Sequence, residues 1–193
     1  MSGREPYGAI PFDIDAAQML WILRRMRDDA IFLDGRPLKN PPRLFLGVAG
    51  SPNAPNPRYE ARRLEKKINA GAQFIQTQLV YDVDAFAAWM EALDKRNLLD
   101  QVHILAGVGP LRGAKSARYI ATQLHSVRVP PAMLARMENA RDAQEEGVQI
   151  ALEIIERLRK LKGVSGIHLM AMGWEEVVPR LVVEAGLPAQ AVS

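Results

Sequence analysis

Short, nearly continuous apolar runs alternate along this chain with longer stretches whose apolar residues recur every three or four positions. Runs of the first kind are typical of buried β-strands, and stretches of the second kind are typical of amphipathic helices. The pattern predicts four strands, at residues 44–49, 72–82, 103–106 and 166–170. It predicts helices at 15–28, 59–70, 83–96, 114–123, 144–161 and 175–185, and a further helical stretch that begins at Pro130-Pro131.

The order of these elements predicts an α/β protein. Each strand is followed by a helix and is almost entirely apolar, which is typical of a parallel sheet covered by helices on both faces. In barrels of this kind, ligand-contacting residues gather where the strands end, in the loops that lead into the helices. Here those loops are 50–58, 78–84, 107–113 and 171–174.

One strand breaks the apolar pattern. In the stretch 72–82, the residues Gln76, Thr77 and Gln78 interrupt a run of apolar and β-branched residues. Burying an amide is costly unless it is hydrogen-bonded, so polar side chains at the end of a core strand are expected to face a ligand. Gln78 could equally be a structural amide that is satisfied within the protein, and Tyr81, which follows it, is a further site candidate.

Composition narrows the class of protein without identifying it. The chain has 193 residues, 48% of them hydrophobic, which suits a single soluble domain spanning residues 1–193. It has no cysteine, so disulfides, thiolate metal sites and a cysteine nucleophile are excluded, and a cytoplasmic location is expected. No stretch approaches the roughly 20 apolar residues of a membrane span, and residues 1–12 form an irregular lead-in without the apolar run of a signal peptide.

Charge gives little indication of a partner. The net charge is +3, and the densest basic segment, 58–67, has Glu60 and Glu65 among its basic residues. Such a mixture is typical of a solvated helix face, and Lys67 in it is expected to be exposed unless it serves an anion. Nucleic-acid binding would need a continuous basic stripe, which is missing. The three histidines lack metal-ligand spacing, and His168, within an apolar strand, is expected to be a neutral core residue bonded to the backbone.

Four ordered motifs carry a resemblance to a known family. They are Phe45-Leu-Gly-Val-Ala-Gly-Ser-Pro52, Arg63-Leu-Glu-Lys-Lys-Ile-Asn-Ala-Gly-Ala-Gln-Phe-Ile-Gln-Thr-Gln78, Ile104-Leu-Ala-Gly-Val-Gly-Pro-Leu111 and Gly166-Ile-His-Leu-Met170. Together the motifs resemble those of the 5,10-methylenetetrahydrofolate reductases, and the flanking segments, from about residue 11 to residue 187, agree with the same family.

The resemblance implies a flavin enzyme on a (β/α)8 TIM barrel. Members use NADH or NADPH to reduce bound FAD, which passes hydride to 5,10-methylenetetrahydrofolate and yields 5-methyltetrahydrofolate. By this resemblance Lys67 lies near the FAD phosphates, and Ala49 lets the flavin approach closely. Glu60 and Arg63 occupy flavin-contacting positions without matching the family's residue types. Gln78 matches a glutamine that hydrogen-bonds the pterin-like ring of the folate.

The resemblance also implies that this chain corresponds to about the last four βα units of the barrel, since a closed eight-stranded barrel takes about 250 residues. The family's catalytic acid and its Arg-Gly-Asp element belong to the first four strands, so the catalytic residues are unknown here. Ser2-Gly3-Arg4-Glu5 does not reproduce the Arg-Gly-Asp element. A half-barrel exposes sheet edges, so a second copy or a complementary N-terminal half is expected as partner.

Two other functions remain open at this point. The chain could be a non-catalytic barrel half or assembly subunit that completes its barrel with a partner chain. It could also be an unrelated α/β enzyme that acts on a phosphorylated small molecule through the loop 107–113. However, Gly107-Val-Gly-Pro110 in this loop is only a weak phosphate-loop motif and is better interpreted as a tight turn that lets a ligand approach. Flavin content distinguishes the flavin-dependent reductase from the unrelated α/β enzyme. Oligomeric state distinguishes the reductase from the assembly subunit.

Overall fold

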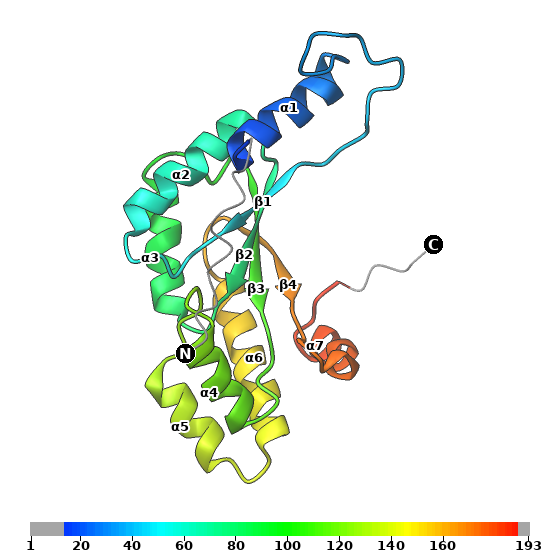
Figure 1. The fold of residues 1–193 in the computed structure, drawn as a ribbon. Coiled ribbons are helices and arrows are strands. Elements are labelled where there is room, and N and C mark those ends of the chain that lie inside the picture. The colour runs from blue at the N-terminus through cyan, green and yellow to red at the C-terminus, as the bar shows by residue number, and fades with distance from the viewer. Residues whose placement is uncertain (1–13, 189–193) are drawn as a thin grey trace, which may run out of the picture.

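A computed structural model describes residues 14–188, and its centre is a four-stranded parallel sheet (Figure 1). The strands are β1 (Gly47–Gly50), β2 (Phe74–Leu79), β3 (His103–Val108) and β4 (Val164–Leu169), and they lie side by side in chain order. The interpretations of residues 1–12 and of Ser2–Glu5 lie outside the described residues. The predicted fold class, an α/β fold of (β/α)8 barrel type to which this chain contributes four βα units, agrees with this architecture.

Helices separate the strands in the predicted order. They are α1 (Ala16–Asp28), α2 (Pro57–Ala70), α3 (Val83–Asp94), α4 (Ala114–Gln123), α5 (Pro131–Asn139), α6 (Ala143–Arg159), the 3-10 turn η1 (Glu175–Val177) and α7 (Val178–Glu184). Most boundaries differ from the sequence prediction by one to three residues. The first strand begins at Gly47 rather than Leu44, and the last helical segment opens as a 3-10 turn before α7.

Local capping explains where several helices begin. Asp15 accepts a hydrogen bond from the Gln18 N–H at 2.8 Å, while the Gln18 side chain accepts from the Asp15 N–H at 2.7 Å. Asp82 accepts a hydrogen bond from the Ala85 N–H at 2.9 Å and starts α3. Each cap satisfies a backbone donor that the first helical turn leaves without an intrahelical partner.

The hydrophobic core fills one side of the sheet only. Along β2, Ile75 and Leu79 are buried against the helices, whereas Gln76 and Gln78 are exposed on the opposite side. We call the latter side the open face. The sequence predicted helices on both faces, and this is wrong for the described residues: helix α6 packs on β3 and β4, and helix α3 contacts both α2 and α6 on the same side (Figure 1).

The amino-terminal end of the open face is apolar. Phe45 stacks on Phe74 with their ring centroids 5.3 Å apart, yet 62% of Phe45 remains exposed. Gly47 allows this packing, because a Cβ there would lie 2.1 Å from the Phe74 ring. The open face therefore combines an aromatic surface at one end with amides nearer the strand ends.

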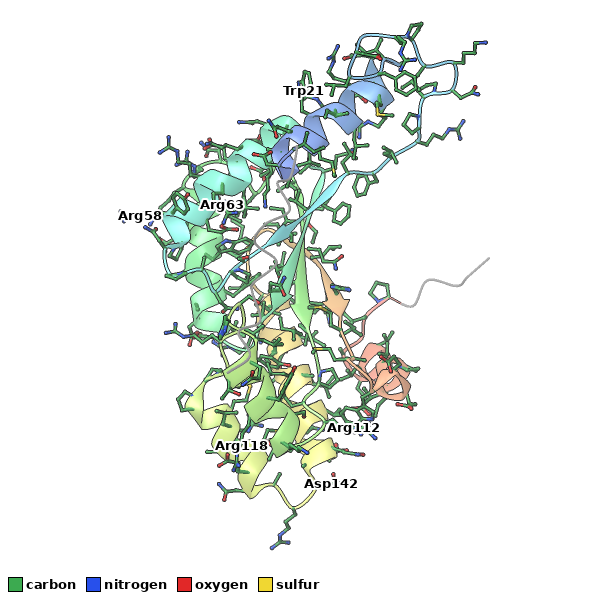
Figure 2. The ribbon with its side chains drawn as sticks, in the orientation of Figure 1. Trp21, Arg58, Arg63, Arg112, Arg118 and Asp142 are labelled. Atoms are coloured by element: carbon green, nitrogen blue, oxygen red, sulfur yellow. The ribbon has the colours of Figure 1, made fainter. Side chains whose placement is uncertain are left out.

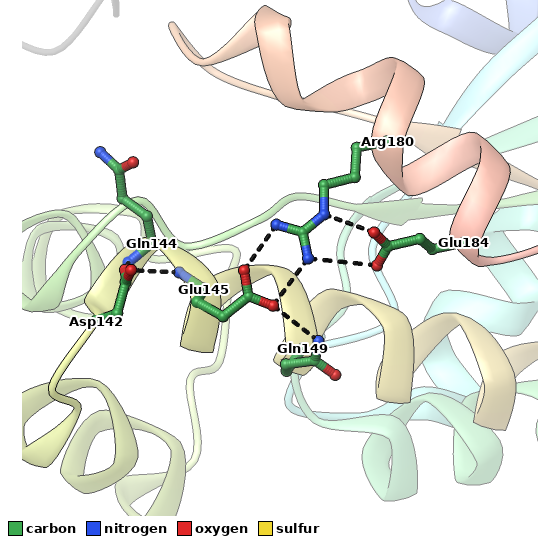
Figure 3. A network of polar contacts seen from close by, with 6 residues as sticks. All are labelled: Asp142, Gln144, Glu145, Gln149, Arg180 and Glu184. Atoms are coloured by element: carbon green, nitrogen blue, oxygen red, sulfur yellow. Dashed lines mark hydrogen bonds and ion pairs between the residues drawn. The ribbon is translucent and has the colours of Figure 1, made fainter.

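Arg180 fastens the last helix to α6 through the network drawn in Figure 3. Its guanidinium donates to Glu145 of α6 at 2.7 Å and to Glu184 of α7 at 2.6 Å. The Arg180 hydrogen bonds lower the pKa of Glu145 to about 2 and raise the pKa of Arg180. These exposed pairs orient α7 against α6, although individual surface ion pairs contribute little to stability.

Candidate functional site

The carboxyl end of β2 is irregular, and Thr77 stabilises it. The register with β3 shifts between Gln76 and Leu79. The Thr77 hydroxyl accepts a hydrogen bond from the Gly107 N–H and donates to the Gln78 carbonyl, both at 2.9 Å. Only 3% of Thr77 is exposed, because successive residues of a strand alternate between the two faces. The expectation that Thr77 faces a ligand together with its neighbours is therefore wrong.

Gln76 and Gln78 do lie together on the open face. Both are exposed, and Gln78 makes no side-chain hydrogen bond within the described part of the chain. The Gln76 Nε2 atom lies 3.5 Å from the Nε2 atom of His168 on β4. Among the described residues, the buried Nδ1 atom of His168 has no hydrogen-bond partner, which corrects the expectation that this ring is bonded to the backbone.

Ala49, a small residue of the edge strand β1, lies beside these amides, and Lys67 of α2 reaches the same strand. Ala49 of β1 is exposed and pairs in register with Gln76 of β2. The Lys67 ammonium donates to the Ala49 carbonyl at 3.4 Å. Lys67 is half-buried rather than fully exposed, and it forms no ion pair within residues 14–188. The structure thus brings together Ala49 and Lys67, which are 18 residues apart in the chain.

Glu60 and Arg63 form a pair on the same helix. The Arg63 Nη1 atom lies 3.2 Å from Glu60 Oε2, where the Glu60 side chain is 4% exposed and that of Arg63 is 55% exposed. Arg58 and Arg63 both lie along α2 in Figure 2. The buried carboxylate is charge-compensated by an arginine that still presents most of its side chain to solvent, so the cation remains accessible to a second anion.

Tyr81 occupies a different environment from Gln78. It is 2% exposed, and its hydroxyl donates to the Gly109 carbonyl at 3.0 Å. Burial raises the pKa of the Tyr81 phenol. Through this hydrogen bond Tyr81 connects the loop after β2 to the loop after β3. The predicted contact of Tyr81 with a substrate stays a prediction.

The loops after the strands are joined by hydrogen bonds that the sequence did not reveal. Asn53 donates to the Leu79 carbonyl at 3.4 Å and to the Ser126 carbonyl at 3.1 Å. Arg112, labelled in Figure 2, donates to the Gly173 carbonyl at 3.4 Å. Both residues were part of the predicted loops, but their long-range partners leave no local signal in the sequence. The four loops after the strands therefore form one connected rim.

Two of the glycines of the loop 107–113 are packed against the protein itself. A Cβ at Gly107 would lie 2.7 Å from the Thr77 carbonyl oxygen, and one at Gly109 would lie 2.6 Å from that of Met170. Close approach of backbone is a usual reason for glycine in a strand or turn. The prediction of a tight turn agrees with this packing, but at these two positions it is neighbouring protein, rather than a ligand, that occupies the space.

Within residues 14–188, no three side chains of His, Cys, Asp or Glu gather as a metal site would require. Over the same residues, no helix has the length and apolar character needed to cross a bilayer.

Comparison with known proteins identifies relatives of this chain. The family model for methylenetetrahydrofolate reductase matches residues 16–186. Methylenetetrahydrofolate reductase 1 of Schizosaccharomyces pombe is 29% identical over 152 residues, which cover 74% of this chain and 24% of the relative. The 5,10-methylenetetrahydrofolate reductase of Escherichia coli is 26% identical over 131 residues, which cover 65% of this chain and 43% of the relative.

A solved structure supports the fold. An uncharacterized protein from Clostridium thermocellum, described as binding two copies of 5-methyl-5,6,7,8-tetrahydrofolic acid, superposes with a TM-score of 0.56 and 20% sequence identity, over 75% of this chain and 53% of that one. The chain spans only about a quarter of the fission-yeast relative and less than half of the bacterial one. The match over residues 16–186 nevertheless takes in every described strand and helix, and the chain belongs to the methylenetetrahydrofolate reductase family.

Proposed function

We propose that this chain supplies the flavin- and folate-contacting half of an enzyme that reduces 5,10-methylenetetrahydrofolate to 5-methyltetrahydrofolate with NADH or NADPH. Membership of the family and the names of its relatives support this activity. The observation that carries the proposal is that Gln78, whose amide has no hydrogen-bond partner among the described residues, lies on the open face two residues beyond Gln76. Gln76 is the partner in register of Ala49, whose carbonyl accepts from Lys67 of α2. Bound FAD would supply hydride transfer, and this chain would supply orientation and charge.

The residues on β1 and α2 fit an FAD cofactor. A diphosphate requires cationic or N–H partners, and Lys67 is a half-buried ammonium without a carboxylate partner in the described chain. Arg63 adds a second cation on the same helix, oriented by the buried Glu60 carboxylate. Ala49 places only a methyl group on the exposed sheet surface, which leaves room for a flat ring. NADH or NADPH would then approach as co-substrate.

Gln78 is the proposed folate contact. An amide offers two donors and one acceptor, which suits the edge of a pterin ring that carries both kinds of group. We place Tyr81 behind this contact, where its bond to Gly109 holds the loop after β2 in position. No residue is assigned as the catalytic acid, because the described open face carries amides and an imidazole but no exposed carboxylate at its centre.

We further propose that the barrel is completed by a second copy of the chain or by a complementary N-terminal half, and that the protein acts in the cytoplasm. Within the described residues β1 and β4 are edge strands, and the aromatic end of the open face leaves Phe45 62% exposed. Unpaired edges and exposed aromatic surface favour association. The same edges support the alternative in which this chain is a non-catalytic assembly subunit.

A visible absorption spectrum of the purified chain with and without FAD tests the cofactor. We expect a bound-flavin band, and we expect Lys67→Ala to weaken FAD binding by about tenfold to a hundredfold, the effect of losing one charge-assisted contact. Lys66→Ala removes an exposed neighbouring cation from the same helix and serves as control. Equal FAD affinity in Lys67→Ala and the parent would remove Lys67 from the site.

Titration with 5-methyltetrahydrofolate tests the substrate contact separately. Gln78→Ala should weaken folate binding and leave FAD binding unchanged, because the proposed contact of this amide is with the pterin ring rather than with the FAD phosphates. A parent chain that binds neither ligand, but does so after a complementary half is added, would favour the split enzyme. A complete complex that binds neither ligand would favour the assembly subunit.

A further inference from the structure

The proposed function leaves one polar contact on the open face without a role. Gln76 and His168 come from strands that are not neighbours, since β3 lies between β2 and β4. Their Nε2 atoms nevertheless lie 3.5 Å apart. On β3 the residue opposite His168 is Gly107, which has no side chain to separate them. The two residues therefore meet above the middle of the sheet.

Hydrogen-bond chemistry couples the states of these two side chains. When the Gln76 NH2 group faces the ring, the His168 Nε2 atom must accept, so the ring proton of a neutral imidazole lies on Nδ1. When the imidazole carries its proton on Nε2, the Gln76 amide must turn its oxygen toward the ring. The position of the ring proton on the imidazole thus determines whether the oxygen or the NH2 group of Gln76 points toward the surface.

The surroundings of His168 leave open which of its ring nitrogens carries the proton. Its Nδ1 atom is buried and has no partner among the described residues, so the protein itself does not fix the tautomer through that nitrogen. A buried polar group without a partner is destabilising, which is expected where a residue serves a ligand rather than the fold. Gln76, by contrast, is exposed on the open face.

We propose that Gln76 is a second ring-binding residue and that His168 is its positioning residue. This inference rests on the proposed function, because it assigns Gln76 to the same ligand as Gln78. The two glutamines lie on one face of a strand, about 6.6 Å apart at 3.3 Å per residue, so their amides can contact one bicyclic ring. With its NH2 on His168, Gln76 presents its oxygen to N–H donors of that ring, such as those of a pterin.

Nitrogen-15 NMR of histidine-labelled chain tests the inference, since the sequence has only three histidines. The probe is 5-methyltetrahydrofolate, added to the chain together with FAD and, where required for binding, with the complementary half. We expect His168 to hold its proton on Nδ1 and its Nε2 resonance to shift on ligand binding, while His125 in its exposed turn does not shift. A pair that only fills space inside a barrel would show no ligand-dependent shift.

Substitutions separate the positioning role from packing. Gln76→Leu, at an exposed position, should fold normally, weaken folate binding by about tenfold and abolish the His168 shift. His168→Gln keeps a polar group near the Nε2 position and should retain binding, whereas His168→Leu should weaken binding by at most the same tenfold; far-UV circular dichroism verifies folding.

The outcomes distinguish this inference from the proposed function. Folate binding with an unmoved His168 resonance and unchanged affinity in Gln76→Leu would overturn the inference and leave the function intact. Absence of folate binding by the complete complex would overturn the proposed function, and the inference with it.

Discussion

The two faces of β2 have opposite characters although their residues alternate in one six-residue strand. Toward the helices, Ile75, Thr77 and Leu79 are each at most 3% exposed. Toward the open face, Gln76 and Gln78 are exposed and their amides are available to a ligand. The hydroxyl of Thr77 on the buried side hydrogen-bonds two backbone groups, whereas the amides of Gln76 and Gln78 on the open side bond no backbone group of the described residues.

This difference separates stability from function within one segment. Substitutions on the helix-covered face remove packing or buried hydrogen bonds, so they should change the free energy of unfolding. Substitutions on the open face remove groups that already contact water, so they should change ligand binding and leave stability nearly unaltered. The following predictions test this separation, from the largest expected effect to the smallest.

The largest effect is expected in the core beneath the sheet. Phe86 is fully buried and packs on Trp89 with their ring centroids 5.4 Å apart. Phe86→Ala should lower the free energy of unfolding by about 3–5 kcal/mol, because it removes a large buried ring and leaves a cavity. Urea denaturation measures this loss. Gln78→Ala is the matched change on the open face and should remain within about 0.5 kcal/mol of the parent; a comparable loss there would contradict the separation.

The second prediction concerns Gly147, where helix propensity and packing have opposite effects on the stability of an alanine substitution. Gly147 lies inside α6, where alanine is favoured over glycine by about 1 kcal/mol. A Cβ at Gly147 would, however, lie 1.8 Å from the Leu111 carbonyl oxygen. Because that obstacle is backbone, Gly147→Ala should destabilise the chain by about 2–3 kcal/mol as measured by urea denaturation.

Gly113→Ala provides the control for this substitution. A Cβ there meets nothing within 4 Å, and the residue has an extended φ of 178°. Its stability should therefore change little, even though it precedes α4. A Gly147→Ala chain as stable as the parent would show that α6 can move away from the loop after β3.

The third prediction concerns the buried hydroxyl of β2. Thr77→Val preserves the shape of the side chain but removes the acceptor for the Gly107 N–H. Leaving that buried donor unpaired should cost about 1–2 kcal/mol. Thermal unfolding and amide hydrogen exchange of Gly107 measure the effect. Unaltered exchange at Gly107 would mean that the irregular end of β2 does not depend on this side chain.

Much of the fold could be predicted from the amino-acid sequence because its causes are local. The predicted limits of the 114–123 helix match α4, and the predicted start of the 83–96 helix matches that of α3. The motifs around Lys67 and Gln78 indicated the family, which the match over residues 16–186 confirms. Alternation along a strand places Thr77 and its neighbouring glutamines on different faces, but local sequence could not indicate which face the helices cover, because polarity alone does not reveal the strand's orientation.

Sequence by itself thus determined the order of strands and helices, the absence of cysteine chemistry and the family, since each depends on periodicity, composition or ordered motifs. Only the tertiary structure decided which face of the sheet is covered, that Lys67 reaches Ala49, and that Gln76 meets His168 across β3. Those contacts join residues 18 and 92 positions apart. The physical reason is that strand pairing and helix packing, which operate between distant segments, set the surroundings of each side chain.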